Sequence, residues 1–199
     1  MTYTPTSRAP FLRTWLIWVA GFLAFPLAGL IGTLVIGRVD DPIAALTGGA
    51  ITGLVLGTGQ TLTSSHRLRA SRWIPATTVG LSAGLLVGTS AVDYRTSLAD
   101  LALMGALNGL VVGACQAAAL PPGGRRRWVW TPIASILWAL GWTVTTLLMV
   151  SVDEQFIVFG ASGALVFAAL SGLALYWLVP ARTDADTPAE FPTTTAATP

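Results

Sequence analysis

One segment of this chain occurs twice. Residues Gly49 to Gln60 read GAITGLVLGTGQ, and residues Gly105 to Gln116 read GALNGLVVGACQ. Both copies keep three glycines spaced four residues apart, which are Gly49, Gly53 and Gly57 in the first copy and Gly105, Gly109 and Gly113 in the second. Small residues four apart lie on one face of a helix and allow a second backbone to approach closely. The repeat therefore predicts a helix-packing unit that the protein uses more than once.

The composition places these helices in a membrane. The chain is 53% hydrophobic and only 10% charged, with a mean hydropathy of +0.69. Soluble globular domains carry about 25% charged residues, so this chain has too little polar surface to face water on all sides. All 11 basic residues are arginine, and lysine is absent. Arginine without lysine, in a chain rich in Ala, Gly and Pro, indicates GC-rich codons and a bacterial source.

Charged residues divide the chain into six long uncharged segments, and each has the roughly 20 residues needed to cross about 30 Å of hydrocarbon. The sequence therefore predicts an all-α, polytopic membrane protein with six transmembrane helices. The segments are Thr14–Gly37, Pro42–Ser65, Trp73–Val92, Leu101–Gly124, Trp128–Val152 and Gln155–Ala181.

The arginines predict how these segments are oriented. If the N-terminus is cytoplasmic, the inner loops and tails hold nine arginines and the outer loops hold two, Arg38 and Arg95. Cytoplasmic loops of membrane proteins carry an excess of arginine and lysine. We therefore expect both termini in the cytoplasm and a multi-pass location in the bacterial plasma membrane.

The six segments read as three tandem helical hairpins, residues 14–65, 73–124 and 128–181. The sixth segment resembles the fourth, with Ser171 in the place of Gln116, and the third resembles the fifth. In that second alignment Gly80, Gly84 and Gly88 match Ser135, Ala139 and Thr143. The hairpins share one orientation, so the repeats are parallel and are packed through glycine faces. We expect the transmembrane domain to span residues 14–181, with cytoplasmic tails at 1–13 and 182–199, the latter disordered.

Five polar residues within the segments are candidates for a functional lining. Gln60 and Gln116 end the two copies of the repeat on the glycine face, Thr52 and Asn108 lie beside that face, and Ser171 replaces the glutamine in the sixth segment. They either bond to neighbouring helices, at about 0.6 kcal/mol each, or line a path for a ligand or solute. The sequence leaves both readings open.

The chain resembles uncharacterised multi-pass bacterial membrane proteins with tandem GxxxGxxQ segments, each followed by an arginine loop and a tryptophan. The resemblance implies no known activity. The matching residues are Gly53, Gly57, Gln60, Arg72 and Trp73, followed by Gly109, Gly113, Gln116, Arg127 and Trp128.

The two arginine loops are candidates for contact with lipid headgroups. Anionic lipids attract such clusters, although the same arginines also serve to orient the helices. The residues are Arg67, Arg69 and Arg72 in one loop and Arg125, Arg126 and Arg127 in the other.

No Asp, Glu, Lys, Arg or His lies in the middle of any segment, the one histidine is His66 in a loop, and the one cysteine is Cys115. Intramembrane enzymes and proton-coupled transporters need ionisable groups at depth. We therefore expect no enzyme activity, cofactor, metal site or nucleic-acid partner. The leading prediction is a structural or accessory membrane protein that binds lipid, another membrane protein or a second copy of itself. The alternative is a passive pore or facilitator for a small neutral solute.

Overall fold

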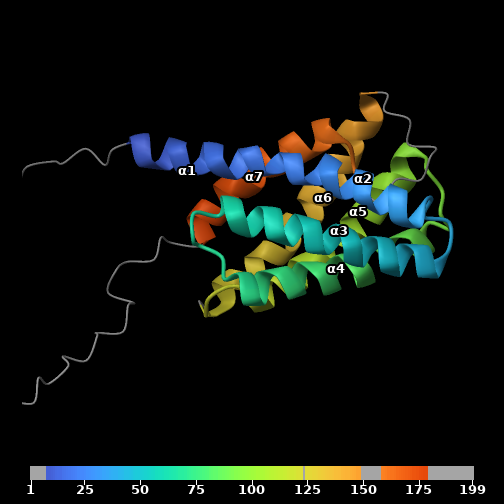
Figure 1. The fold of residues 1–199 in the computed structure, drawn as a ribbon, viewed down its shortest axis with the longest axis horizontal. Coiled ribbons are helices and arrows are strands. Elements are labelled where there is room, and N and C mark those ends of the chain that lie inside the picture. Colours follow the sequence, from blue (N-terminus) through green and yellow to red (C-terminus); the bar gives the residue numbers. More distant parts are fainter. Residues whose placement is uncertain (1–7, 123, 149–157, 179–199) are drawn as a thin grey trace, which may run out of the picture.

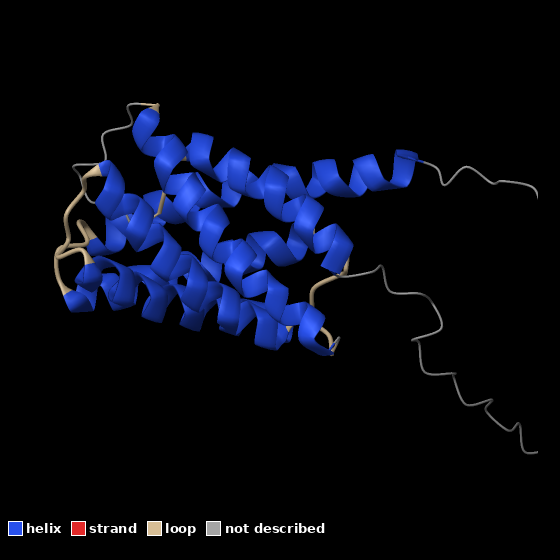
Figure 2. Cartoon of the chain, turned by 180° about the vertical axis from the view of Figure 1, so that it is seen from behind, coloured by secondary structure: helices blue, strands red, loops and turns tan. Residues whose placement is uncertain are grey.

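The computed structural model of the chain describes residues 8–122, 124–148 and 158–178, and every regular element in this part is a helix (Figures 1 and 2). The predicted C-terminal tail, 182–199, and most of the N-terminal tail lie outside the described residues. The elements in chain order are α1 (Arg8–Ala20), a short 3-10 turn η1 (Gly21–Leu23), α2 (Ala24–Ile36), α3 (Pro42–Thr63), α4 (Ala70–Ala91), α5 (Leu98–Ala119), a second 3-10 turn η2 (Gly124–Val129), α6 (Trp130–Leu147) and α7 (Ala161–Leu178).

Five helical segments are long and apolar enough to cross a membrane: Phe11–Ile36, Pro42–Thr63, Ala70–Ala91, Leu98–Ala119 and Ala161–Leu178. The first of them joins α1, η1 and α2 into one continuous rod. The sequence predicted six such segments, and α6 is the one that is not among the five. Its 18 residues include three tryptophans and four threonines, which lower its mean hydropathy.

Local signals explain where the helices begin. The carboxylate of Asp41 accepts hydrogen bonds from the backbone N–H groups of Ile43 and Ala44, and Pro42 occupies the first turn of α3. Both features are typical helix starts, because proline there loses no hydrogen bond and the cap satisfies free N–H groups. Ser97 caps α5 in the same way by accepting from the N–H of Asp100.

The helices pack in chain order and then close on themselves. Each of α2 to α6 contacts the next helix along the chain, and α1 and η1 return to contact α7, so the contacts close into a ring. The α3–α4 and α4–α5 connections are short, and short connections favour antiparallel neighbours. We call the α3–α4, α5–α6 and α7–α1 contacts the first, second and third seams.

The predicted glycine faces lie where helix backbones meet. The glycine face of α3 packs against α4, that of α4 packs against α5, and that of α5 packs against α6. The residues of these faces are Gly49, Gly53 and Gly57 on α3, Gly80, Gly84 and Gly88 on α4, and Gly105, Gly109 and Gly113 on α5. A Cβ added at Gly53 would lie 2.6 Å from Cα of Thr78, and one added at Gly109 would lie 2.6 Å from the carbonyl oxygen of Ala134. Such distances leave no room for a side chain, so any larger residue would push the helices apart.

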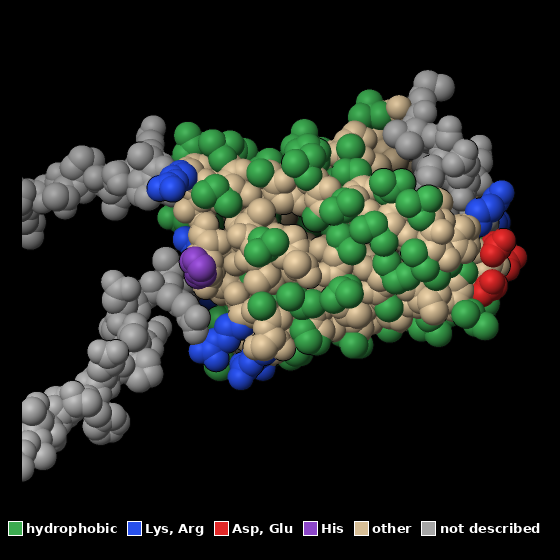
Figure 3. Space-filling model, in the orientation of Figure 1, with side chains coloured by type: hydrophobic (Ala, Val, Ile, Leu, Met, Phe, Trp, Pro, Cys, Tyr) green, Lys and Arg blue, Asp and Glu red, His purple; other side chains and the backbone are tan. Residues whose placement is uncertain are grey.

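Charged side chains gather at the two ends of the bundle, and the flank between them carries apolar and uncharged polar groups (Figure 3). Phe11 of α1 packs on Tyr176 of α7, and Arg67 lies over that tyrosine, so these segments share one end. We call it the basic end, because it holds Arg13, Arg67, Arg69, Arg72, Arg126 and Arg127. The opposite, acidic end holds Asp40, Asp41, Asp93 and Asp100 with Arg38 and Arg95.

Candidate functional site

Two stripes of residues run along α3, and the repeat places the same stripes on α5. Gly49, Gly53 and Gly57 form the stripe against α4, while Thr52 and Gln60 belong to a second buried stripe. Residues four apart drift only about 40° around a helix, so each stripe keeps facing the same neighbour over several turns. The glutamine that ends each repeat therefore lies in the interior, at the basic end of the bundle.

Both glutamines accept a hydrogen bond from a tryptophan on the next helix. The indole N–H of Trp73 donates to Oε1 of Gln60 at 2.8 Å, and the indole N–H of Trp130 donates to Oε1 of Gln116 at 2.8 Å. All four side chains are buried. The first bond spans the first seam and the second bond spans the second seam.

The two pairs join into one network. Nε2 of Gln116 donates to the hydroxyl of Thr77 at 3.0 Å and, at 3.4 Å, to Oε1 of Gln60. The rings of Trp73 and Trp130 lie with their centroids 6.5 Å apart. We call these five residues, Gln60, Trp73, Thr77, Gln116 and Trp130, the amide cluster.

The groups of the amide cluster are suited to holding helices together rather than to acid–base chemistry. Amides, indoles and hydroxyls do not ionise in the physiological pH range, so the cluster neither gains nor loses protons. Oε1 of Gln60 accepts two bonds and Oε1 of Gln116 accepts one. Buried polar groups that are bonded in this way hold helices together.

A third bond of the same kind lies at the third seam. The indole N–H of Trp18 on α1 donates to the hydroxyl of Ser171 on α7 at 3.0 Å. The neighbouring Trp15 donates to the carbonyl oxygen of Ala169 at 2.9 Å. Ser171 stands where the repeat placed a glutamine, so all three seams carry a tryptophan N–H bonded to the same repeat position.

The sequence alignment of the fifth segment was wrong by two residues at its start. It matched Trp73 with Trp128, but the tryptophan that bonds to Gln116 is Trp130. Trp128 is 46% exposed and lies in η2, a 3-10 turn that takes up the extra residues before α6 begins. A tryptophan 13 residues after Gln60 and 14 after Gln116 was the signal that could have identified the pair.

The glycine that corresponds to Gly84 is likewise Gly141 rather than Ala139. Gly141 faces the next helix, because a Cβ added at Gly163 of α7 would collide with the Gly141 carbonyl oxygen. This shift follows from the same two-residue difference in register.

Thr52 and Asn108 are the other two predicted lining residues, and both are fully buried. Neither the Thr52 hydroxyl nor either polar atom of the Asn108 amide has a hydrogen-bond partner in the described protein. Asn108 lies against the backbone of Gly84 on α4. The five predicted lining residues therefore divide into three that are bonded, Gln60, Gln116 and Ser171, and two that are not.

The arginines of the two loops lie at the basic end in different surroundings. Arg67 is half-buried with its guanidinium 4.6 Å from the Tyr176 ring centroid, whereas Arg69 and Arg72 are exposed. Arg126 lies 4.2 Å from the Trp177 ring centroid and donates to the backbone carbonyl of that residue, and Arg127 lies 5.5 Å from the Trp128 ring centroid. The side chain of Arg125 lies outside the described residues.

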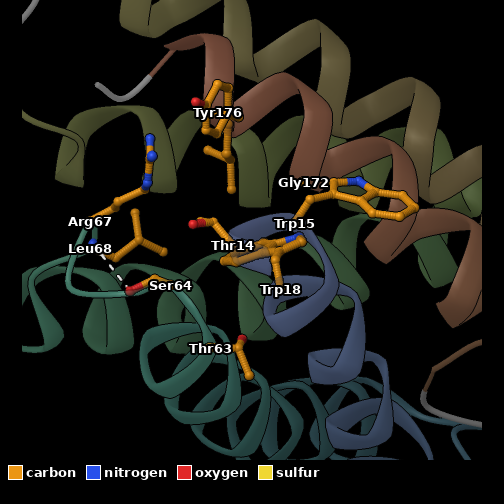
Figure 4. A pocket seen from close by; sticks show the side chains of 10 residues that line it. Thr14, Trp15, Trp18, Thr63, Ser64, Arg67, Leu68, Gly172 and Tyr176 are labelled. Carbon is orange, nitrogen blue, oxygen red and sulfur yellow. Dashed lines mark hydrogen bonds between the residues drawn. The ribbon is translucent and has the colours of Figure 1, made fainter. Parts of the chain in front are cut away.

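A pocket lies at the basic end between α1, the end of α3 and α7 (Figure 4). Its empty volume, open mouth included, is about 370 Å³. The lining combines apolar groups, three hydroxyls and the Arg67 guanidinium. It consists of Thr14, Trp15, Trp18, Thr63, Ser64, Arg67, Leu68, Gly172, Leu175 and Tyr176.

No family model, curated protein or solved structure matches the chain significantly. Among the described residues, no three His, Cys, Asp or Glu side chains gather closely enough to hold a metal ion. The functional argument therefore starts from the amide cluster, the unpartnered Thr52 and Asn108, and the charge distribution.

Proposed function

We propose that this chain is a non-enzymatic integral membrane protein of the bacterial plasma membrane, a structural or accessory component that holds lipid or another membrane protein. It crosses the bilayer six times as three tandem hairpins packed through glycine faces, with both termini in the cytoplasm. The observation that carries the proposal is the bonding of Gln60 and Gln116 to Trp73 and Trp130. These two buried glutamine side chains are engaged in joining helices.

The surface of the bundle supports the membrane location. Large apolar side chains on the flank are widely exposed, such as Leu34 at 76%, Leu62 at 78% and Ile136 at 66%. Exposed apolar surface on this scale is unfavourable in water and favourable against lipid. Arginines at one end and carboxylates at the other suit a cytoplasmic and an outer surface.

We take α6 as the sixth span although it is not among the five segments that are long and apolar enough on mean hydropathy. Its 18 residues extend about 27 Å at 1.5 Å per residue, close to the thickness of the hydrocarbon core. It packs between α5 and α7, and its Trp138 and Trp142 are buried in the protein rather than exposed to lipid. A helix whose polar groups face other helices needs less hydrophobicity to remain in the bilayer.

A second candidate function, a passive facilitator for a small neutral solute, is favoured by Thr52 and Asn108. Their buried polar atoms lack protein partners, and such atoms are found beside water or ligands. A continuous path would also have to pass the amide cluster. Osmotic swelling of proteoliposomes with glycerol outside tests this function. Glycerol entry above that of empty vesicles, and lost in Asn108→Leu, would make the facilitator the better proposal.

Cysteine labelling tests the six-span topology. In a Cys115→Ala background, single cysteines replace the exposed Ser65 at the basic end, and the exposed Ala99 and Leu148 at the acidic end. A membrane-impermeant maleimide added to intact spheroplasts should label Ala99→Cys and Leu148→Cys, and should label Ser65→Cys only after lysis. If Leu148→Cys behaves like Ser65→Cys, α6 does not cross the membrane and the proposal of six spans is wrong.

A further inference from the structure

The third seam differs from the other two, and the pocket lies beside it. In place of a glutamine, α7 presents the shorter Ser171, and the amide cluster does not extend to this seam. Gly172 leaves room for the indoles, since a Cβ there would lie 2.6 Å from Cδ1 of Trp18. The tryptophans of α1 therefore meet α7 directly and form one wall of the pocket.

The opposite wall comes from the end of α3, and a close helix crossing limits the depth of the pocket. A Cβ added at Gly21 would lie 2.7 Å from Oγ1 of Thr63, and one at Gly59 would lie 2.6 Å from Cβ of Ala24. At this level the two glycines let α3 and the α1–α2 rod pack closely. From there toward the basic end the space between α1 and the α3–α4 loop opens into the pocket (Figure 4).

The pocket lining contains both apolar and polar groups. Indole, leucine and glycine surfaces come from α1 and α7, whereas the hydroxyls of Thr14, Thr63 and Ser64 and the guanidinium of Arg67 supply the polar part. Arg67 is the one charged residue of the lining, so a ligand in the pocket meets a positive charge. The site therefore favours a ligand that is anionic at one end and apolar at the other.

We propose that this pocket binds the headgroup end of an anionic phospholipid, with the phosphate at Arg67. The inference rests on the proposed function, since it needs the basic end to lie at the headgroup level of a membrane. The pocket is open at its mouth, so it takes the headgroup phosphate while most of the lipid remains outside. The acyl chains lie outside, along the exposed Leu16 and Ile17 of α1.

Native mass spectrometry of the protein released from nanodiscs tests the proposal. The nanodiscs contain equal amounts of phosphatidylglycerol and phosphatidylcholine, and the measured quantity is the ratio of the two lipids retained on the protein. We expect the wild type to retain phosphatidylglycerol preferentially. Arg67→Gln should reduce that preference about tenfold, the effect of losing one hydrogen bond to a charged group.

Arg69→Gln is the matched control, because it removes the same charge from an exposed position in the same loop, outside the pocket lining. It should leave the preference within about twofold of the wild type, as expected for an exposed charge. A third variant, Thr14→Phe, fills the pocket without changing its charge and should also displace the lipid. Circular dichroism of each variant in the nanodisc confirms that the helices are retained.

Equal losses in Arg67→Gln and Arg69→Gln would mean diffuse attraction to the basic end and would overturn the site. Retention unaffected by Thr14→Phe would place the lipid elsewhere and would overturn it as well, as would equal retention of both lipids by the wild type. None of these results changes the six-span topology, which the cysteine labelling measures separately. A failure of the lipid site and a failure of the proposed function are therefore distinguishable.

Discussion

The indole N–H of Trp130 donates to Oε1 of Gln116 at 2.8 Å across the second seam, and the same glutamine reaches Thr77 and Gln60 through Nε2. One side chain thus connects three helices, α3, α4 and α6, to α5. The bond between Trp73 and Gln60 is equivalent in geometry and joins the first seam. The ring of helices is therefore held together by polar contacts at its basic end and by backbone contacts along its glycine faces.

Replacing Gln116 with leucine should destabilise the fold by about 2 kcal/mol, because it leaves the buried N–H of Trp130 without an acceptor. The measurement is the free energy of unfolding in detergent micelles. Trp130→Phe removes the other partner, and the double variant should cost clearly less than the sum of the two single variants. Strict additivity would show that the two side chains do not depend on each other.

Ser171→Ala should cost only about 1 kcal/mol in the same assay, because Ser171 takes part in two bonds whereas Gln116 takes part in three. The comparison ranks the third seam as weaker than the second. A loss as large as that of Gln116→Leu would contradict this ranking.

Gly109→Leu should destabilise the protein far more than Leu107→Ala. The leucine side chain at position 109 meets the backbone of α6, where even a Cβ would lie 2.6 Å from the carbonyl oxygen of Ala134. Overpacking of this kind costs about 1–3 kcal/mol or more. Leu107 is only half-buried, so its truncation removes little packing. Similar unfolding free energies for the two variants would refute the role of the glycine face.

Thr52→Val should leave stability unchanged or raise it slightly. The Thr52 hydroxyl is fully buried without a protein partner, and an apolar group of the same shape removes the cost of that unmet hydrogen bond. A loss of more than about 1 kcal/mol would mean that water or a solute bonds to Thr52. That outcome would favour the facilitator over the structural role.

Arg95→Gln at the acidic end should change stability by less than about 0.5 kcal/mol. Arg95 pairs with Asp100 at 3.3 Å, but the arginine side chain is 65% exposed and water screens the pair. The assay is thermal unfolding in detergent, with Ser97→Ala for comparison. Ser97 also caps α5, so its loss should have the larger effect.

The sequence alone was enough to predict an all-helical chain, the glycine faces and the charged ends. These features follow from local pattern: residues four apart share a helix face, and long uncharged segments separate the arginines from the carboxylates. The positions of Gln60 and Gln116 on an inward face followed from the same periodicity. Helix α6 was predicted by length, although it is not among the five segments that are long and apolar enough to cross a membrane.

The partners of those residues were decided only by the tertiary structure. Trp130 rather than Trp128 bonds to Gln116 because the 3-10 turn η2 shifts the register of α6, which no periodicity of the glycines records. The return of α1 to α7, which pairs Trp18 with Ser171, joins residues 153 positions apart. Local pattern sets which face of a helix is small or polar, whereas the identity of the neighbour depends on how all the helices pack at once.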